Sequence, residues 1–254
     1  MPWLHAALRY RQTPLITAIT LVVLVSWLWV ATMARDMYGP MTGASRWMMT
    51  PRWDAPHVLL LWAMWAVMMT AMMLPSAGPM ILLAGDAAPR GGSARTRSAY
   101  LLALGYLVVW AIFSAGATAL QLLLARLFVL TPMMEVSSPR TAALLLAVAG
   151  VYQWTPWKRS CLTACQSPLA FLLRRWRSGP WGAFRMGLEH GAYCVGCCWA
   201  VMLLLFAGGV MNLAVIAALT AFVAFEKLVP AGAHGARVSG VLLVAAAVWI
   251  AVRS

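Results

Sequence analysis

The sequence contains few charged residues, and acidic residues are the scarcest of all. Only six of 254 residues are Asp or Glu, and charged side chains of both signs make up 10% of the chain. An ordinary soluble domain carries about 25% charged residues, which excludes that class. The 63% of hydrophobic residues and the mean hydropathy of +0.81 are typical of integral membrane proteins. No internal repeat is evident and no soluble domain fits between the apolar runs, so we expect a single membrane domain over residues 1–254.

The scarcity of acidic residues leaves a formal net charge of +13. In a soluble protein this charge would favour a nucleic-acid partner, but no basic stripe here carries interleaved aromatic residues. Lys and Arg instead occur between apolar runs, where they set membrane topology and contact anionic lipid. We therefore expect the lipid bilayer as a partner and no nucleic acid.

Seven apolar runs predict an all-α fold, a polytopic transmembrane helical bundle of about seven spans. Most runs reach the roughly 20 residues that a bilayer core requires, although the fourth is short and could be re-entrant. The first is too long for the apolar part of a signal peptide and no cleavage site follows it, so it predicts an anchor. The expected spans are residues 15–34, 57–83, 99–124, 141–154, 181–206, 210–229 and 236–252.

The distribution of Lys and Arg predicts the orientation of these spans. With the N-terminus in the cytoplasm, twelve basic residues lie in or next to the inner connections and six in the outer ones. Cytoplasmic connections carry the excess of basic residues in membrane proteins. We therefore expect a cytoplasmic N-terminus and a C-terminus on the outer side.

Three cysteines, a histidine and a glutamate lie within the fifth run, in the segment GLEHGAYCVGCCW. Ionisable residues are costly inside a bilayer, so they indicate a functional site. At 100° per residue of helix, an arc of about 120° collects five side chains, with Glu189 at its edge. His190 and Cys194 lie one turn apart, as do Cys194 and Cys198, so each pair could chelate an ion. The five side chains are those of Met186, His190, Cys194, Cys197 and Cys198.

Two further groups of sulfur ligands lie elsewhere in the chain. Cys161 and Cys165, in the segment CLTAC, could bind one metal if that segment is helical, or form a disulfide if it turns back. In the methionine-rich second run, Met68 and Met72 share one face and are expected at depths similar to the cysteine cluster. Packing is the alternative explanation, because methionine fills cores and a buried cysteine acts as a small hydrophobe.

These ligands favour a soft metal ion. Thiolates and thioethers prefer copper(I), and a set of Cys and His also suits zinc(II), so we expect Cu(I) first and Zn(II) second. Five cysteines cannot all pair within one chain, which favours metal ligation or redox chemistry over a disulfide framework. The expected ligands are Cys194, Cys197, Cys198, His190, Cys161, Cys165, Met68, Met72 and Glu189.

Four motifs occur in one order over roughly residues 50–235: MMTAMMLP, QWTPWKRSCLTACQSP, GLEHGAYCVGCCW and FEKLVP. Together they resemble a bacterial family of predicted metal-binding integral membrane proteins that carries a domain of unknown function. The resemblance implies a multi-pass protein of the bacterial inner (cytoplasmic) membrane with a metal site. It places the family's motif cysteines on the five cysteines of this chain and its motif methionines around Met68 to Met73. Within FEKLVP, Glu226 is expected to pair with Lys227 or to lie at the membrane interface.

The function expected from these features is binding of a soft metal, copper first, followed by transport or transfer between the protein and a metal donor or acceptor protein. No residue is expected to be catalytic. The alternative is a membrane thiol–disulfide oxidoreductase in which Cys161 and Cys165 exchange electrons with a pair from the fifth run. Adjacent Cys197 and Cys198 would make a poor reversible disulfide, which counts against that alternative. A third possibility is a metal-free scaffold, and the sequence makes no prediction of the oligomeric state.

Overall fold

The computed structural model describes residues 2–39, 54–87, 92–131, 133–229 and 232–253. The described part is mostly helical, with turns and irregular segments between the helices and one isolated bridge between Leu130 and Val136. The helices are α1 (Pro2–Met37), α3 (Ala55–Ala87), α4 (Gly92–Arg126), α5 (Pro139–Tyr152), α6 (Pro156–Gln166), α7 (Pro168–Arg175), α8 (Gly179–Met202), α9 (Leu204–Gly208), α10 (Leu213–Leu228) and α11 (Gly232–Arg253).

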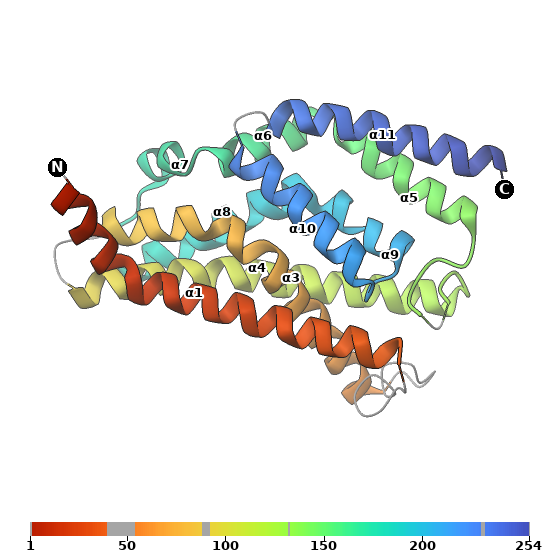
Figure 1. Cartoon of the computed structure of the whole chain (residues 1–254), viewed down its shortest axis with the longest axis horizontal. Coiled ribbons are helices and arrows are strands. Elements are labelled where there is room, and N and C mark those ends of the chain that lie inside the picture. Colours follow the sequence, from red (N-terminus) through yellow and green to blue (C-terminus); the bar gives the residue numbers. More distant parts are fainter. Residues whose placement is uncertain (1, 40–53, 88–91, 132, 230–231, 254) are drawn as a thin grey trace.

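The long helices run back and forth along the long axis of the molecule (Figure 1). Helices α1, α3, α4 and α8 pack successively against one another, and α5 lies beside α11. The N-terminus and the short helix α7 lie toward one end, α6 lies nearer the middle, and the C-terminus lies at the opposite end (Figure 1).

Five helices are long and apolar enough to cross a membrane, and α5 is a shorter apolar helix. The all-α prediction is confirmed, whereas seven complete spans remain a prediction. The expected fifth span, 181–206, lies within the segment Gly179–Gly208, in which α9 follows α8 after the single residue Leu203. The five long helices are Gln12–Met37, Ala55–Ala87, Ala94–Arg126, Gly179–Gly208 and His234–Arg253.

Glycine allows α8 to approach α4 at backbone contact. A Cβ atom on Gly187 would overlap the carbonyl oxygen of Leu102, and one on Gly105 would overlap the carbonyl oxygen of Phe184. Farther along α8, a Cβ on Gly191 would lie 2.9 Å from Cβ of Val109. Small residues permit this approach between membrane helices, where packing rather than water exclusion drives association. The contact fixes the position of the cysteine-bearing face of α8.

Helices α6 and α7 turn back over α8 and carry the basic segment. Thr155 caps α6, since its hydroxyl accepts a hydrogen bond from the backbone N–H of Lys158 at 3.3 Å. Pro156 and Pro168 begin α6 and α7, where a missing N–H costs nothing. Ser167 is the N-cap of α7 as predicted, although its side chain makes no capping hydrogen bond.

Candidate metal centre

The face of α8 predicted from the helical period is buried in the bundle. His190 is 3% exposed, and all three cysteine side chains of α8 are at most 1% exposed. Met186, one turn before His190, is also buried. All five cysteines of the chain are free thiols. The packing therefore gathers soft ligands in the interior without linking them by disulfides.

Cys194 lies at the centre of this cluster, beside a buried cation. The Nζ atom of Lys227, near the end of α10, donates a hydrogen bond to Sγ of Cys194 at 2.8 Å. The same ammonium lies 3.7 Å from Sδ of Met73 and 3.5 Å from Oγ of Ser76, both on α3. Lys227 is only 5% exposed, so water solvates its ammonium little. The charge is therefore stabilised mainly by the sulfur and hydroxyl atoms of these three partners. Burying an ammonium costs free energy unless it is paired. The contact therefore favours packing in which Lys227 of α10 stays beside Cys194 of α8.

A tyrosine connects the same sulfur to the methionine helix. The hydroxyl of Tyr106 on α4 lies 2.9 Å from Sγ of Cys194 and 3.1 Å from the carbonyl oxygen of Met73. The phenol has one proton and the carbonyl can only accept, so a hydroxyl that donates to Met73 is free to accept from the Cys194 thiol. Cys194 is thus contacted by Tyr106 of α4 and Lys227 of α10, and both of these residues also contact Met73 of α3.

The short helix α6 adds another thiol to the cluster. Cys165 is 7% exposed, and its thiol lies close to those of Cys194 and Cys197. The thiols of Cys197 and Cys198 also donate to the backbone carbonyl of Cys194, at 3.1 and 2.9 Å. The sequence left the conformation of CLTAC open, and the structure makes it helical. This conformation directs Cys165 into the cluster from a different element than α8.

Cys161, one turn earlier on α6, lies at the edge of the cluster. A Cβ atom on Gly196 would lie 2.8 Å from Sγ of Cys161, so α6 rests on α8 at that glycine. Cys161 is only partly buried, unlike Cys165. Partial burial raises the pKa of the Cys161 thiol, and nearby Cys197 acts in the same direction. Cys161 is therefore the cysteine of the five that remains partly accessible.

The cluster does not form a high-coordination site. Within the described ranges, no group of three or more His, Cys, Asp or Glu side chains is arranged to hold a metal ion. The thiol of Cys165 lies near those of Cys194 and Cys197, and the sulfur of Met73 lies 3.7 Å from Nζ of Lys227, which also contacts Cys194. Such sulfur donors fit copper(I) better than hard cations or a four-ligand zinc site.

His190 lies among aromatic rings beside the sulfur cluster. Its ring centroid is 5.8 Å from that of Tyr106 and 5.4 Å from that of Phe171 on α7. Its Nδ1 atom is buried and has no hydrogen-bond partner among the described residues. A buried imidazole nitrogen without a partner is available to a ligand or to water.

The remaining expected ligands have different surroundings. Met68 and Met72 are fully buried in α3, but Met73 is the methionine whose sulfur contacts the Lys227 ammonium. Glu189 pairs with arginines instead, at 2.7 Å from Arg177, and also with Arg175 and Arg185 at 3.7 and 3.8 Å. These pairs occupy the carboxylate, so its expected role as a metal ligand has no support in its contacts.

Glu226 forms a buried ion pair, but not with the expected partner. Its carboxylate accepts a hydrogen bond from Nζ of Lys158 at 2.7 Å, and both side chains are 1% exposed. The adjacent Lys227 turns to Cys194 instead. The backbone carbonyl of Glu226 also accepts from Nε2 of Gln166 at 2.7 Å. Two bonds therefore attach α6, which carries Cys165, to the end of α10.

The sequence did not identify Lys227, Tyr106 or Met73 as parts of the centre. Lys227 is one of the twelve basic residues expected in or next to the inner connections, because a lysine near the end of an apolar helix ordinarily extends to the membrane interface. Nothing in the sequence distinguishes Tyr106 from other tyrosines in membrane helices. Met73 lies in the methionine-rich second run, but it follows Met72 directly and so does not share the face of Met68 and Met72.

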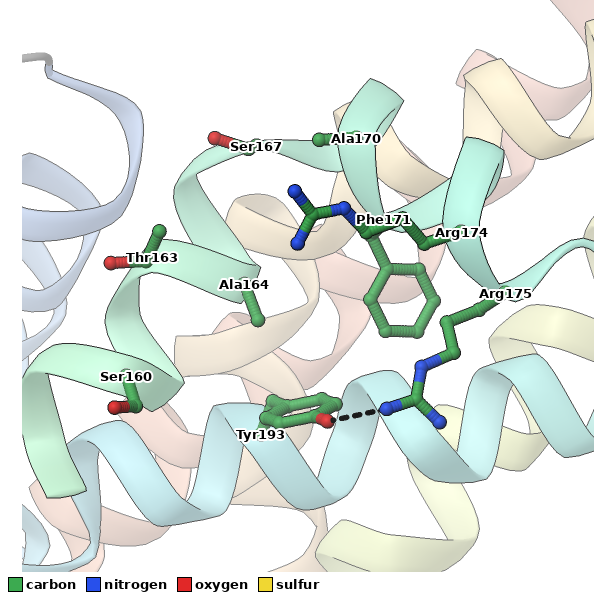
Figure 2. A pocket seen from close by; sticks show the side chains of 9 residues that line it. All are labelled: Ser160, Thr163, Ala164, Ser167, Ala170, Phe171, Arg174, Arg175 and Tyr193. Carbon is green, nitrogen blue, oxygen red and sulfur yellow. Dashed lines mark hydrogen bonds between the residues drawn. The ribbon is translucent and has the colours of Figure 1, made fainter.

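A cavity of about 460 Å³ lies between α6, α7 and α8, close to this centre (Figure 2). Arg174 and Arg175 reach into it from α7, and the hydroxyl of Tyr193 accepts a hydrogen bond from Arg175 at 3.3 Å. Phe171 lines the cavity, and its ring also contacts the ring of His190. Its lining consists of Ser160, Thr163, Ala164, Ser167, Ala170, Phe171, Arg174, Arg175 and Tyr193.

Fold and site together define an all-helical protein with apolar helices of membrane-spanning length around a buried cluster of soft sulfur ligands. Residues 62–250 match the PpoB2 family, which is described as a copper chaperone family. The chain belongs to this family, because the match covers most of its length. No curated protein and no solved structure matches the chain.

Proposed function

We propose that this chain is a multi-pass protein of the bacterial inner membrane that binds copper(I) at Cys194 and transfers it to or from a partner protein. The observation that carries the proposal is the 2.8 Å contact between Nζ of Lys227 and Sγ of Cys194 in a buried sulfur cluster. The PpoB2 family match supports copper as the metal. The five long apolar helices support a membrane location.

Charge balance explains why a cation belongs beside this cluster. Copper(I) held by two thiolates carries a net charge of −1, which is costly to bury alone. The ammonium of Lys227 makes the whole group neutral. In the absence of copper, the same ammonium needs a partner, and Cys194 provides one. The pair therefore suits a site that is alternately filled and emptied.

The proposed ligands are arranged in series rather than in one closed shell. Cys194 binds first, with Cys165 or Cys197 as the second thiolate and Met73 as an additional soft donor. Cys198, His190, Met68 and Met72 line the adjoining interior, and partly accessible Cys161 lies at the entrance. Several moderate sites permit an ion to leave, whereas one very tight site would trap it.

The test is copper content measured together with thiol state. Purified protein loaded with Cu(I) is expected to retain copper against hard cations such as Mg²⁺ and Ca²⁺, and Cys194→Ser should abolish retention. Cys161→Ser is the matched control, because it removes a thiol at the edge and should slow loading while leaving stoichiometry intact. Tight zinc(II) binding without copper(I) binding would change the metal assignment.

Non-reducing gels of the same samples distinguish copper transfer from the alternative thiol–disulfide exchange. A redox enzyme lacking one cysteine of its reactive pair accumulates mixed disulfides with its partner. We expect no such species in Cys165→Ser, but loss of copper. A mixed disulfide in Cys165→Ser, with copper binding unaffected in Cys194→Ser, would favour the oxidoreductase.

The proposed orientation places α6 and α7 on the cytoplasmic side. A topology reporter fused after Arg177 should be cytoplasmic, and one fused after Ser254 should be periplasmic, because the basic residues concentrate around residues 158–177. A periplasmic signal after Arg177 would place the entrance of the sulfur cluster on the opposite side of the membrane.

A further inference from the structure

The cavity between α6, α7 and α8 has the charge of an anion-binding site. Arg174 and Arg175 line it, and no acidic side chain in the described part of the chain pairs with Arg174. Figure 2 shows Arg174 extending toward α6 and Arg175 toward α8. Arg175 shares its charge with Glu189 at 3.7 Å, so Arg174 is the guanidinium left to a ligand.

The cavity has the size and the remaining groups for a small polar molecule. Its volume of about 460 Å³ falls within the range of small-molecule pockets, about 300–1,000 Å³. Hydroxyl residues Ser160, Thr163 and Ser167 line one side, and the rings of Phe171 and Tyr193 line another. Guanidinium groups bind carboxylates with two parallel hydrogen bonds, which gives both affinity and orientation.

The cavity adjoins the sulfur cluster through lining residues that neighbour residues of the cluster. Ser160 and Ala164 on its wall directly precede Cys161 and Cys165 along α6. Phe171 on its wall makes an edge-to-face contact with His190, whose Nδ1 atom is buried without a hydrogen-bond partner among the described residues. A molecule held in the cavity would therefore lie beside both the edge and the interior of the copper centre.

We propose that this cavity binds the copper donor, a small carboxylate-bearing thiol that carries copper(I) on its thiolate. The inference rests on the proposed function of the centre. Arg174 binds a donor carboxylate, and the donor sulfur then faces α6. Copper(I) moves by ligand exchange: a protein thiolate forms a bond to copper, and the donor's copper–sulfur bond breaks. Copper remains Cu(I), and the proton lost by the protein thiol passes to the released donor thiolate.

The experiment compares two copper donors on the full-length protein in lipid nanodiscs. One is the Cu(I) complex of glutathione, which carries carboxylates. The other is Cu(I)–acetonitrile, which carries none. The loading rate is measured by rapid desalting and metal analysis for the parent, Arg174→Gln and Arg159→Gln. Arg159 is the matched control, because it is an exposed arginine of α6 that does not line the cavity.

Arg174→Gln is expected to raise the half-saturating concentration of Cu(I)–glutathione about tenfold and to leave loading from Cu(I)–acetonitrile unchanged. Arg159→Gln should behave like the parent with both donors. The Cu(I) complex of the glutathione diethyl ester should load the parent as poorly as Cu(I)–glutathione loads Arg174→Gln, because the ester lacks free carboxylates.

Equal loading of the parent and Arg174→Gln from Cu(I)–glutathione would overturn the inference, as would full activity of the ester complex. These results differ from a failure of the proposed function. If the parent takes up copper from neither donor, the copper centre itself is wrong. If it takes up copper from both donors and Arg174→Gln changes nothing, only the donor site is wrong.

Discussion

Lys227 donates a hydrogen bond to the sulfur of Cys194 at 2.8 Å, in an interior where both side chains are almost fully buried. The two residues come from α10 and α8 and are 33 positions apart in the chain. The contact joins a lysine ammonium to a soft metal ligand, and Met73 and Tyr106 complete the surroundings. It explains how a negatively charged copper(I)–thiolate group could be accommodated among apolar helices.

Removing the cation should therefore weaken copper binding. Lys227→Met leaves the copper(I)–dithiolate group with an uncompensated buried charge. Loss of one partner of a buried ion pair costs about 3–5 kcal/mol, which corresponds to at least about a hundredfold in affinity. Competition with a Cu(I)-selective chelator measures the change, and Lys227→Arg, which keeps the charge, should lose much less. Unchanged affinity in Lys227→Met would show that the charge plays no part in binding.

The hydroxyl of Tyr106 should contribute a smaller amount. Tyr106→Phe removes one hydrogen bond to Cys194, and bonds to charged groups contribute about 1.5–3 kcal/mol, so copper affinity should fall by about ten- to a hundredfold. Tyr152→Phe is the control, because that hydroxyl donates to the backbone carbonyl of Gly196 on the same helix rather than to a sulfur. The same chelator competition measures both variants. Equal losses in the two variants would indicate a general packing effect instead.

The backbone contact between α4 and α8 should be sensitive to a single methyl group. Gly187→Ala should lower the thermal stability of the detergent-solubilised protein and displace the cysteine face, because its Cβ would overlap the carbonyl oxygen of Leu102. Gly116→Ala, also in this pair of helices, is the control, since nothing lies within 4 Å of its Cβ position. It should be neutral or stabilise slightly, by about 0.5–1 kcal/mol. A neutral Gly187→Ala would contradict the close approach of the two helices.

The buried pair of Lys158 and Glu226 should hold α6 in place. Glu226→Gln leaves the Lys158 ammonium buried without its counter-ion, at a cost of about 3–5 kcal/mol of stability. Arg185→Gln is the comparison, because that side chain is 56% exposed and its pair with Glu189 is worth at most about 1 kcal/mol. Thermal unfolding monitored by circular dichroism gives both values. Similar melting temperatures for Glu226→Gln and the parent would mean that α6 is anchored by other contacts.

The sequence was sufficient for the features that depend on local periodicity. Long apolar runs predicted the helices, and the 100° step along residues 186–198 correctly placed His190 and the cysteines on one buried face. It did not decide whether Cys161 and Cys165 lie on a helix, because the segment 156–166 is short and has few apolar residues.

The partners of these residues could not be predicted, because they depend on how distant helices pack. Glu226 and Lys227 are neighbours in sequence, yet their side chains leave α10 in different directions, toward Lys158 and Cys194. The choice of Met73 over Met68 and Met72 depends on the rotation of α3 against α8 and α10. A periodic pattern identifies a face of a helix but does not specify which atoms of another helix it meets.

The central claim is that copper(I) binds to sulfur at Cys194. X-ray absorption at the copper K-edge of the loaded, purified protein tests it most directly, because the edge reports oxidation state and the fine structure reports the ligand atoms. The account predicts Cu(I) with two or three sulfur ligands in the parent, and loss of that signal in Cys194→Ser. A shell of nitrogen and oxygen ligands, or an unchanged sulfur shell in Cys194→Ser, would contradict it.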